Sequence, residues 1–169
     1  DCSEAATVEN RVLAVTGYGD ALSVPPQVFE GLSDFTIEYW VYRREEMYNS
    51  TELTVRGTDS RIEVGSVINN PSELGLDIFQ QSRIYTSPRA KLPLRNWTHI
   101  AFIRRGAELS LHLDGEHIGS RPDDGSQTPL SDIFDARFGD AAHPDRTGLI
   151  GYLDDIRVWC TARTHEEIL

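Results

Sequence analysis

Residues 97–119, WTHIAFIRRGAELSLHLDGEHIG, decide the fold of this chain. Within them, LSLHL at 109–113 alternates apolar and polar side chains, which is typical of a strand with one buried face. Asp-Gly at 114–115 predicts a turn, because glycine tolerates a positive φ. Upstream, IAFI at 100–103 places apolar side chains on both faces, as expected of a central strand. The stretch therefore predicts two long strands joined by a tight turn and followed by a second turn.

The rest of the chain reads as short strands separated by turns that contain Gly, Pro and Asp. In FTIEYWVYR at 35–43, alternation puts Trp40 and Tyr42 on one face and the other apolar residues on the opposite face. Further predicted strands span 11–16, 20–24, 53–55, 61–66, 74–78, 84–85, 136–139 and 148–160. Thr164 and Glu167 have the spacing of a capping box, which predicts a short C-terminal helix. The pattern predicts an all-β, antiparallel sandwich or barrel.

The chain has 169 residues and a formal net charge of −11. This length suits one domain with a proper core. The negative charge argues against a nucleic-acid partner, because phosphate binding needs clustered Lys and Arg. An acidic surface suits cation binding, solubility or basic partners, and the simplest interpretation is a solvated acidic surface.

The sequence contains no apolar run near the ~20 residues that a membrane span needs, so membrane insertion is not expected. It also contains no signal peptide. The chain opens with Asp1 rather than Met and stops at Leu169, where a helix begins. We therefore expect a single domain, 1–169, that is one module of a longer chain.

The two cysteines, Cys2 and Cys160, lie almost at opposite ends of the chain. The first and last strands of an antiparallel sandwich are often neighbours, so we expect a disulfide between them; the alternative is two separate thiols. On the chain-entropy model such a bridge stabilises by roughly 4–5 kcal/mol. Two sequons, at Asn49 and Asn96, predict glycosylation and point with the disulfide toward a secreted or cell-surface protein.

Several segments resemble the laminin G-like and pentraxin-like domains of the concanavalin A-like jelly-roll superfamily. They are GYGDALSV at 17–24, FTIEYWVYR at 35–43, WTHIAF at 97–102, LSLHLDGEHIGS at 109–120 and GLIGYLDDIRVWCTARTHEEI at 148–168. The resemblance covers essentially the whole chain, in order. It implies a two-sheet antiparallel jelly roll with a short C-terminal helix, so that 1–169 is a single laminin G-like domain.

The resemblance also implies where a ligand binds and of what kind. The curved sheet and rim loops of such domains carry the ligand site, many members hold calcium, and typical partners are glycans or extracellular proteins. The loops at 43–51 and 121–131 are the places where we expect specificity. The sequence does not assign the ligand-binding residues.

Three carboxylates are candidate calcium ligands. Asp154 shares strand parity with Ile156 and Val158, which predicts that it lies on a buried face, where a charge must be paired or metal-bound. Asp20 likewise shares strand parity with Leu22 and Val24 of its own predicted strand. If the first and last strands are neighbours, the two carboxylates meet, with Asp155 as a third ligand and turn carbonyls completing the site. In similar jelly rolls, acidic residues at the places of Asp20 and Asp154 often help to hold calcium. The alternative is that Asp154 pairs with an arginine or caps a turn.

Catalytic patterns are absent from the sequence. Related laminarinase-like enzymes carry Glu-x-Asp-x-x-Glu or Glu-x-Asp-x-Glu on one strand, and neither spacing occurs; Glu38 stands alone in its strand. There is no Gly-x-Ser-x-Gly or His-Glu-x-x-His motif. We expect His99 to be structural. Tryptophans are expected to pack in the core or against a sheet rather than to stack on sugar; they are Trp40, Trp97 and Trp159.

The sequence therefore predicts a non-catalytic, extracellular recognition module that binds glycan or another protein, with calcium as a possible cofactor. One alternative is a structural domain that decorates a large assembly and contacts neighbouring subunits. A diverged glycosidase is the remaining alternative, and it would need two carboxyl groups facing each other across a groove.

Overall fold

The 97–119 stretch forms the centre of a sheet, as predicted. The computed structural model describes residues 12–17, 19–46, 48–67, 70–80, 83–122, 128–140 and 146–168. In it, β9 (Trp97–Arg105) and β10 (Glu108–Leu113) pair antiparallel. The turn after β10 has φ values of 46° at Asp114 and 79° at Gly115. Two successive positive φ values are what a type I′ hairpin turn requires, which explains the Asp-Gly pair.

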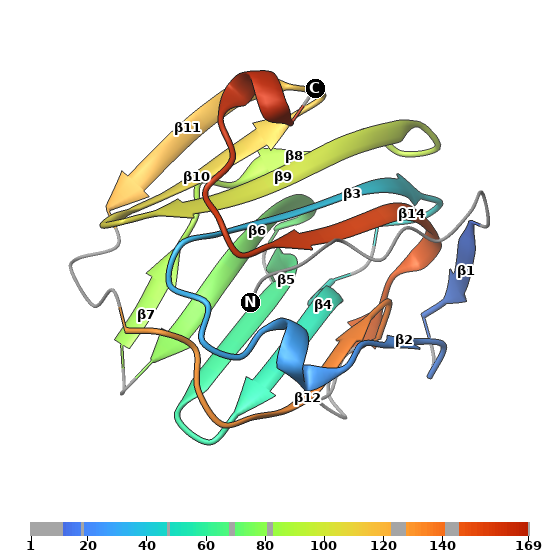
Figure 1. Ribbon diagram of the computed structural model, residues 1–169. Coiled ribbons are helices and arrows are strands. Elements are labelled where there is room, and N and C mark those ends of the chain that lie inside the picture. Colours follow the sequence, from blue (N-terminus) through green and yellow to red (C-terminus); the bar gives the residue numbers. More distant parts are fainter. Residues whose placement is uncertain are drawn as a thin grey trace.

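The described strands form two sheets that face each other, so the predicted antiparallel sandwich is confirmed (Figure 1). The six-stranded sheet runs in the order β1 (Leu13–Thr16), β14 (Ile150–Trp159), β3 (Phe35–Arg43), β9, β10, β11 (Glu116–Pro122). The predicted proximity of the first and last strands is also confirmed, since Leu13 pairs with Leu153 and Thr16 with Ile150.

The eight-stranded sheet has one main path and two side pairings. The path runs β2 (Leu22–Ser23), β12 (Ile133–Phe138), β4 (Ser50–Gly57), β5 (Ser60–Val67), β6 (Asn70–Gln80), β7 (Arg83–Thr86). Beside it, β13 (Thr147–Gly148) pairs parallel with β4, and β8 (Ala90–Lys91) pairs with β6. The described helical segments are two 3-10 turns, η1 (Pro26–Val28) and η2 (His165–Glu167). Neither is long enough to cross a membrane.

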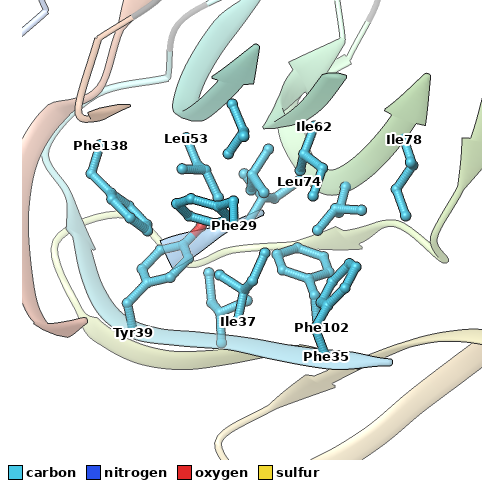
Figure 2. Packing of buried hydrophobic residues seen from close by; sticks show 14 of the residues in the cluster. Phe29, Phe35, Ile37, Tyr39, Leu53, Ile62, Leu74, Ile78, Phe102 and Phe138 are labelled. Carbon is cyan, nitrogen blue, oxygen red and sulfur yellow. The ribbon is translucent and has the colours of Figure 1, made fainter. Parts of the chain in front are cut away.

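The core lies between the two sheets (Figure 2). The inward residues of β3 and β9, such as Ile37 and Phe102, meet Leu53, Ile62 and other inward residues of the opposite sheet, and these side chains are fully buried. Burial at about 25 cal/mol per Å² of apolar surface is the main force that holds the sheets together.

A second, smaller apolar cluster lies on the outer face of the six-stranded sheet, turned away from the core. There Ile168 and Ala162 pack over Ala101 and Ile103 of β9. This cover explains why β9 is apolar on both faces. Where the sequence predicted a short helix, the chain makes only the 3-10 turn η2, in which the Glu167 N–H donates to the Thr164 carbonyl at 3.1 Å.

The sequence did not predict strand β11, which follows the turn at 114–115 and pairs with β10. It was missed because its residues alternate neither in polarity nor in burial: all are exposed except the half-buried Gly119. Pairing with β10, and not burial, holds this edge strand. A strand of this kind carries no period-two signal for sequence reasoning to find.

A buried ion pair crosses from one sheet to the other. Arg43, the last residue of β3, has its Nε 3.3 Å from a carboxylate oxygen of Glu52 in β4. The Tyr39 hydroxyl donates to the other Glu52 oxygen at 2.9 Å. All three side chains are at most 1% exposed. Burial raises the pKa of Glu52, and the Arg43 charge and the Tyr39 hydrogen bond oppose that rise.

We predict that Glu52→Leu lowers the free energy of unfolding by about 3–5 kcal/mol, because it leaves the Arg43 charge buried without its partner. The triple variant Arg43→Met, Glu52→Leu, Tyr39→Phe removes all three polar groups and should recover most of that loss. Urea unfolding measures both. A triple variant as unstable as the single one would contradict this account of the ion pair.

Three histidines meet beside η2 on the outer face. The ring centroids of His112 and His117 lie 4.9 Å apart, and those of His112 and His165 lie 6.1 Å apart. Burial, the largest cause, and the two neighbouring histidines together lower the pKa of His112 from 6.5 to about 4. The folded protein therefore binds this proton less readily than the unfolded chain.

Because the folded pKa of His112 lies below its unfolded value, stability from this group is complete above pH 6.5 and falls as the pH drops toward about 4. We predict that His112→Leu flattens this part of the pH dependence of unfolding. Chemical unfolding across the same pH range tests it. An equally steep loss of stability in the variant would show that other groups cause the dependence.

Candidate functional site

Three aromatic rings meet on the outer face of the six-stranded sheet. The strand register pairs Tyr42 of β3 with Tyr152 of β14 on one side and with Trp97 of β9 on the other. Ring centroids are 5.7 Å apart for Tyr42 and Tyr152, and 5.6 Å apart for Tyr42 and Trp97. We call these three residues the aromatic cluster. Each is half-buried, so part of each ring is open to solvent.

A glycine lets the strands approach closely beneath this cluster. A Cβ atom at Gly151 would overlap the carbonyl oxygen of Tyr42 in the neighbouring strand. Only glycine fits that approach, which sets Tyr152 beside Tyr42.

Trp40 extends the aromatic surface by one residue pair along the sheet. It pairs with His99 of β9, and the two ring centroids lie 5.3 Å apart. Trp40 is 38% exposed, whereas His99 is 8% exposed. Burial lowers the pKa of His99, and the nearby Glu38 carboxylate opposes this effect. We therefore expect the His99 imidazole to be neutral at neutral pH. Its ring packs beside the Trp40 ring.

The buried carboxylate of Glu38 contacts three side chains of this face. The side chain is 1% exposed. It accepts a hydrogen bond from the Trp159 indole nitrogen at 2.7 Å, and His99 Nε2 lies 3.6 Å from its other oxygen. Arg157 Nη1 lies 3.7 Å away. Glu38 therefore fixes its neighbours and is not open to a ligand.

A shallow, open pocket of about 270 Å³ adjoins the aromatic cluster. Tyr42 and Tyr152 form part of its wall, and Arg44, Glu45 and Arg95 form the rest. Arg44 and Glu45 belong to the 43–51 loop in which the sequence placed specificity. Three of its five lining residues are charged, so the site combines the ring surface of Tyr42 and Tyr152 with a mainly polar wall.

The outer face of the eight-stranded sheet has a different character. It carries ion pairs: Arg89 with Asp77 at 2.8 Å, Arg56 with Asp135 at 2.9 Å, and Arg146 with Glu63 at 2.5 Å. The arginine and acidic side chains of this face are therefore paired with one another. Of the two outer faces, the one on the six-stranded sheet offers accessible rings beside a pocket, and it is the candidate functional site.

The family model of the concanavalin A-like lectin and glucanase superfamily, in its laminin G form, matches residues 16–169. The chain belongs to this superfamily. This finding confirms the resemblance that the sequence motifs suggested, and the match runs through every described strand from the end of β1. No curated protein sequence matches the chain.

Solved structures with the same fold include carbohydrate-binding domains. The CBM40 domain of the Ruminococcus gnavus IT-sialidase, bound to α2,3-sialyllactose, has a TM-score of 0.71 at 13% identity, over 98% of this chain and 94% of that one. Domain 4 of the Geobacillus stearothermophilus arabinanase AbnA, in complex with arabinotriose, has a TM-score of 0.72 at 16% identity, over 97% and 78%. The heptameric pentraxin from Limulus polyphemus has a TM-score of 0.64 at 11% identity, over 93% and 78%.

The prediction that Asp154 lies on the same buried face of its strand as Ile156 and Val158 is wrong. A β-bulge interrupts β14, so that Asp154 pairs with Trp40 and the next pairing joins Arg157 to Glu38. Asp155, at φ 49°, lies inside the bulge. Asp155 and Ile156 lie opposite the single residue Tyr39, and this one extra residue reverses the alternation, which places Asp154 on the outer face beside Trp40 and not with the buried Val158 face.

The predicted calcium ligands are already engaged and lie apart. Asp155 pairs with Arg157 at 2.5 Å, and an Asp154 oxygen accepts the Asp155 N–H at 2.8 Å. Asp20 accepts hydrogen bonds from the Thr16 N–H and hydroxyl. Thr16 pairs with Ile150 at the start of β14. The Asp20 carboxylate therefore lies near Ile150, which is about 13 Å along β14 from Asp154.

These residues do not fit a calcium site. Calcium takes six to eight oxygen ligands, and carboxylates that pair with arginine or lie apart cannot supply them together. Within the described ranges, no three His, Cys, Asp or Glu side chains gather in a way that could hold a metal ion.

Several other predicted residues are only partly placed. Cys160 is not a free thiol, but Cys2 lies outside the described residues, so the Cys2–Cys160 bridge stays a prediction. Asn96 is exposed and Asn49 is half-buried, and their glycosylation also stays a prediction. Within the 121–131 loop, in which the sequence also placed specificity, residues 123–127 lie outside the described residues.

The three tryptophans lie on the outer face of the six-stranded sheet and not in the core between the sheets. Trp159 packs on the sheet through its bond to Glu38, as predicted, whereas Trp40 and Trp97 present ring surface beside the pocket. The alternation in FTIEYWVYR was the signal that found Trp40 and Tyr42. Arg44 and Arg95 were missed, because no local pattern shows that a loop and a distant turn line one pocket.

We predict that excess calcium leaves the midpoint of thermal unfolding unchanged, and that Asp154→Ala does too. A native-state site at a hundredfold excess over its Kd would stabilise by about 2.7 kcal/mol. Differential scanning calorimetry with calcium and then with chelator measures this. A calcium-dependent rise that Asp154→Ala abolishes would contradict the account of these carboxylates.

Proposed function

We propose that this chain is a non-catalytic carbohydrate-binding module that binds glycan on the outer face of its six-stranded sheet. The observation that carries the proposal is the aromatic cluster of Tyr42, Trp97 and Tyr152 beside the pocket. Sugar rings have apolar C–H faces that stack on aromatic rings, while their hydroxyl groups bond to polar groups at the edge.

The rings are pre-positioned for such a ligand. They project from adjacent strands of one sheet, and each makes contact with the other two, at centroid distances of 5.6 to 6.4 Å. Binding therefore orders few side chains, which limits the entropy lost on association.

The known structures of the fold support the same chemistry. One similar domain is bound to a sialylated glycan and another to an arabinose oligosaccharide. Their identities to this chain, 16% and 13%, are too low to transfer a ligand. They support glycan as the class of ligand, and the residues of the pocket bear on which sugar binds.

The arrangement of carboxylates supports a binding module and not a glycosidase. Hydrolysis needs two carboxyl groups at about 5–9 Å across the bound sugar. The buried carboxylate of this face, Glu38, is held by Trp159, His99 and Arg157. The sequence also lacks the carboxylate spacings of the related enzymes.

We further propose that the module is extracellular, secreted or on a cell surface, and is part of a longer chain. Two sequons, a cysteine near each end of the chain and relatives that include an extracellular arabinanase support this location. The alternative of an assembly domain is not favoured. Among the described residues, the large exposed apolar side chains come from separate elements, as with Ile84, Ile118 and Phe134, and form no common patch by their position in the strands.

We predict that Trp97→Ala and Tyr42→Ala each weaken glycan binding at least about fivefold, because stacking on an aromatic side chain contributes about 1–3 kcal/mol, as it does for nucleic-acid bases. Phe134→Ala is the matched control, since Phe134 is a 60% exposed ring on the other sheet. A glycan array that carries neutral and acidic oligosaccharides finds the ligand, and calorimetry measures the variants. Binding that Phe134→Ala removes and Trp97→Ala leaves unchanged would contradict the proposed face.

A further inference from the structure

The side chains of two pocket arginines have no partner among the residues that the structure describes. Among the described residues, the guanidinium groups of Arg44, Arg95 and Arg121 make no ion pair or hydrogen bond. Arg44 and Arg95 line the same pocket. In a chain of net charge −11, where the arginines of the opposite face are paired with acidic side chains, two unpaired arginines in one pocket are unusual.

The backbone holds both arginines in place although they are 51 positions apart. The Arg44 N–H donates to the Ile150 carbonyl at 2.9 Å, and the Arg95 N–H donates to the Arg43 carbonyl at 2.7 Å. Arg95 has a φ of 56°, a left-handed conformation that residues other than glycine rarely adopt. Strained conformations of this kind persist where the surrounding structure fixes them, and they cluster at binding sites.

The charge of the pocket matches a ligand with one negative charge. Two arginines and Glu45 give the wall a net charge of +1. The planar fork of arginine donates two parallel hydrogen bonds to a carboxylate. Tyr42 and Tyr152 supply the ring surface on which the rest of a sugar can lie. The volume of about 270 Å³ suits one sugar residue.

A densely sulfated polymer fits this surface poorly. Such a ligand needs a row of cationic groups. The neighbouring part of the face instead carries Asp154 beside Trp40, and Asp114, whose carboxylate accepts the His99 N–H at 2.8 Å.

We propose that the pocket selects a sugar that carries a carboxylate, a hexuronic acid or a sialic acid, with Arg44 and Arg95 as the residues that bind the carboxylate. This inference rests on the proposed function, because it assigns the class of sugar that the same face binds. It makes the two arginines determinants of specificity, while the aromatic cluster supplies the stacking surface.

The test compares each acidic sugar with its own methyl ester, which keeps the sugar skeleton and removes the charge. The probes are trigalacturonic acid and its trimethyl ester, and 3′-sialyllactose and its methyl ester, with heparin as the sulfated polymer. Isothermal titration calorimetry gives the affinities. We expect one of the two acids to bind at least tenfold more tightly than its ester, and the pair that responds identifies the source of the carboxylate.

The variants Arg44→Gln and Arg95→Gln should each weaken binding of that acid at least tenfold and lower the ratio of acid affinity to ester affinity. Arg121→Gln is the matched control, since Arg121 is exposed and equally unpaired but lies in β11, outside the pocket. Thermal unfolding of all three variants shows whether each one is folded as the parent is.

The outcomes separate this inference from the proposed function. Equal binding of acid and ester, or tighter binding of heparin than of either acid, overturns the carboxylate assignment and leaves glycan binding in place. An effect of Arg121→Gln equal to that of Arg44→Gln also overturns it, because general charge would then explain the loss. If neither these probes nor a glycan array shows binding, both the inference and the proposed function fail.

Discussion

The buried ion pair between Arg43 and Glu52 is the interaction on which the rest of the structure depends. It joins β3 of one sheet to β4 of the other inside an apolar core, where a single unpaired charge would be costly. Arg43 also organises the candidate site through its backbone. Its carbonyl accepts the Arg95 N–H, and it pairs with Gly151 in β14. The next residue, Arg44, turns outward into the pocket. Arg43 therefore joins the two sheets through its side chain and positions both proposed carboxylate-binding arginines through its backbone.

The two outer faces of the sandwich show how alternation in a strand separates stability from recognition. In β3, the residues that alternate with Ile37 and Tyr39 are Trp40 and Tyr42, so the strand that fills the core also presents the recognition surface. The eight-stranded sheet uses its outward positions for ion pairs, which have modest energy and leave little unsatisfied chemistry. On the proposed function, recognition is then a property of one face, and the opposite sheet serves as its support.

Sequence reasoning predicted the fold because its signals are local. The period-two pattern of β10, the Asp-Gly turn and the two-faced apolar run of β9 each report the environment of their own residues. The same reasoning failed at the Asp154 bulge, because parity counting assumes an unbroken ladder of strand pairs and the one extra residue of the bulge reverses the parity. It could place Tyr42 on the outer face but could not see Arg95 arrive beside it, since that meeting depends on the pairing of distant segments.

The central claim is that the outer face of the six-stranded sheet binds glycan, and the tryptophans give the most direct test. The chain has three, and all lie on that face in different settings: Trp97 in the aromatic cluster, Trp40 beside it, and Trp159 bonded to Glu38. Their indole N–H signals can be followed by NMR while 3′-sialyllactose or trigalacturonic acid is added. The account predicts that the Trp97 signal shifts most, the Trp40 signal less and the Trp159 signal least. Shifts confined to residues of β4, β5 and β6, with all three indoles unmoved, would contradict it.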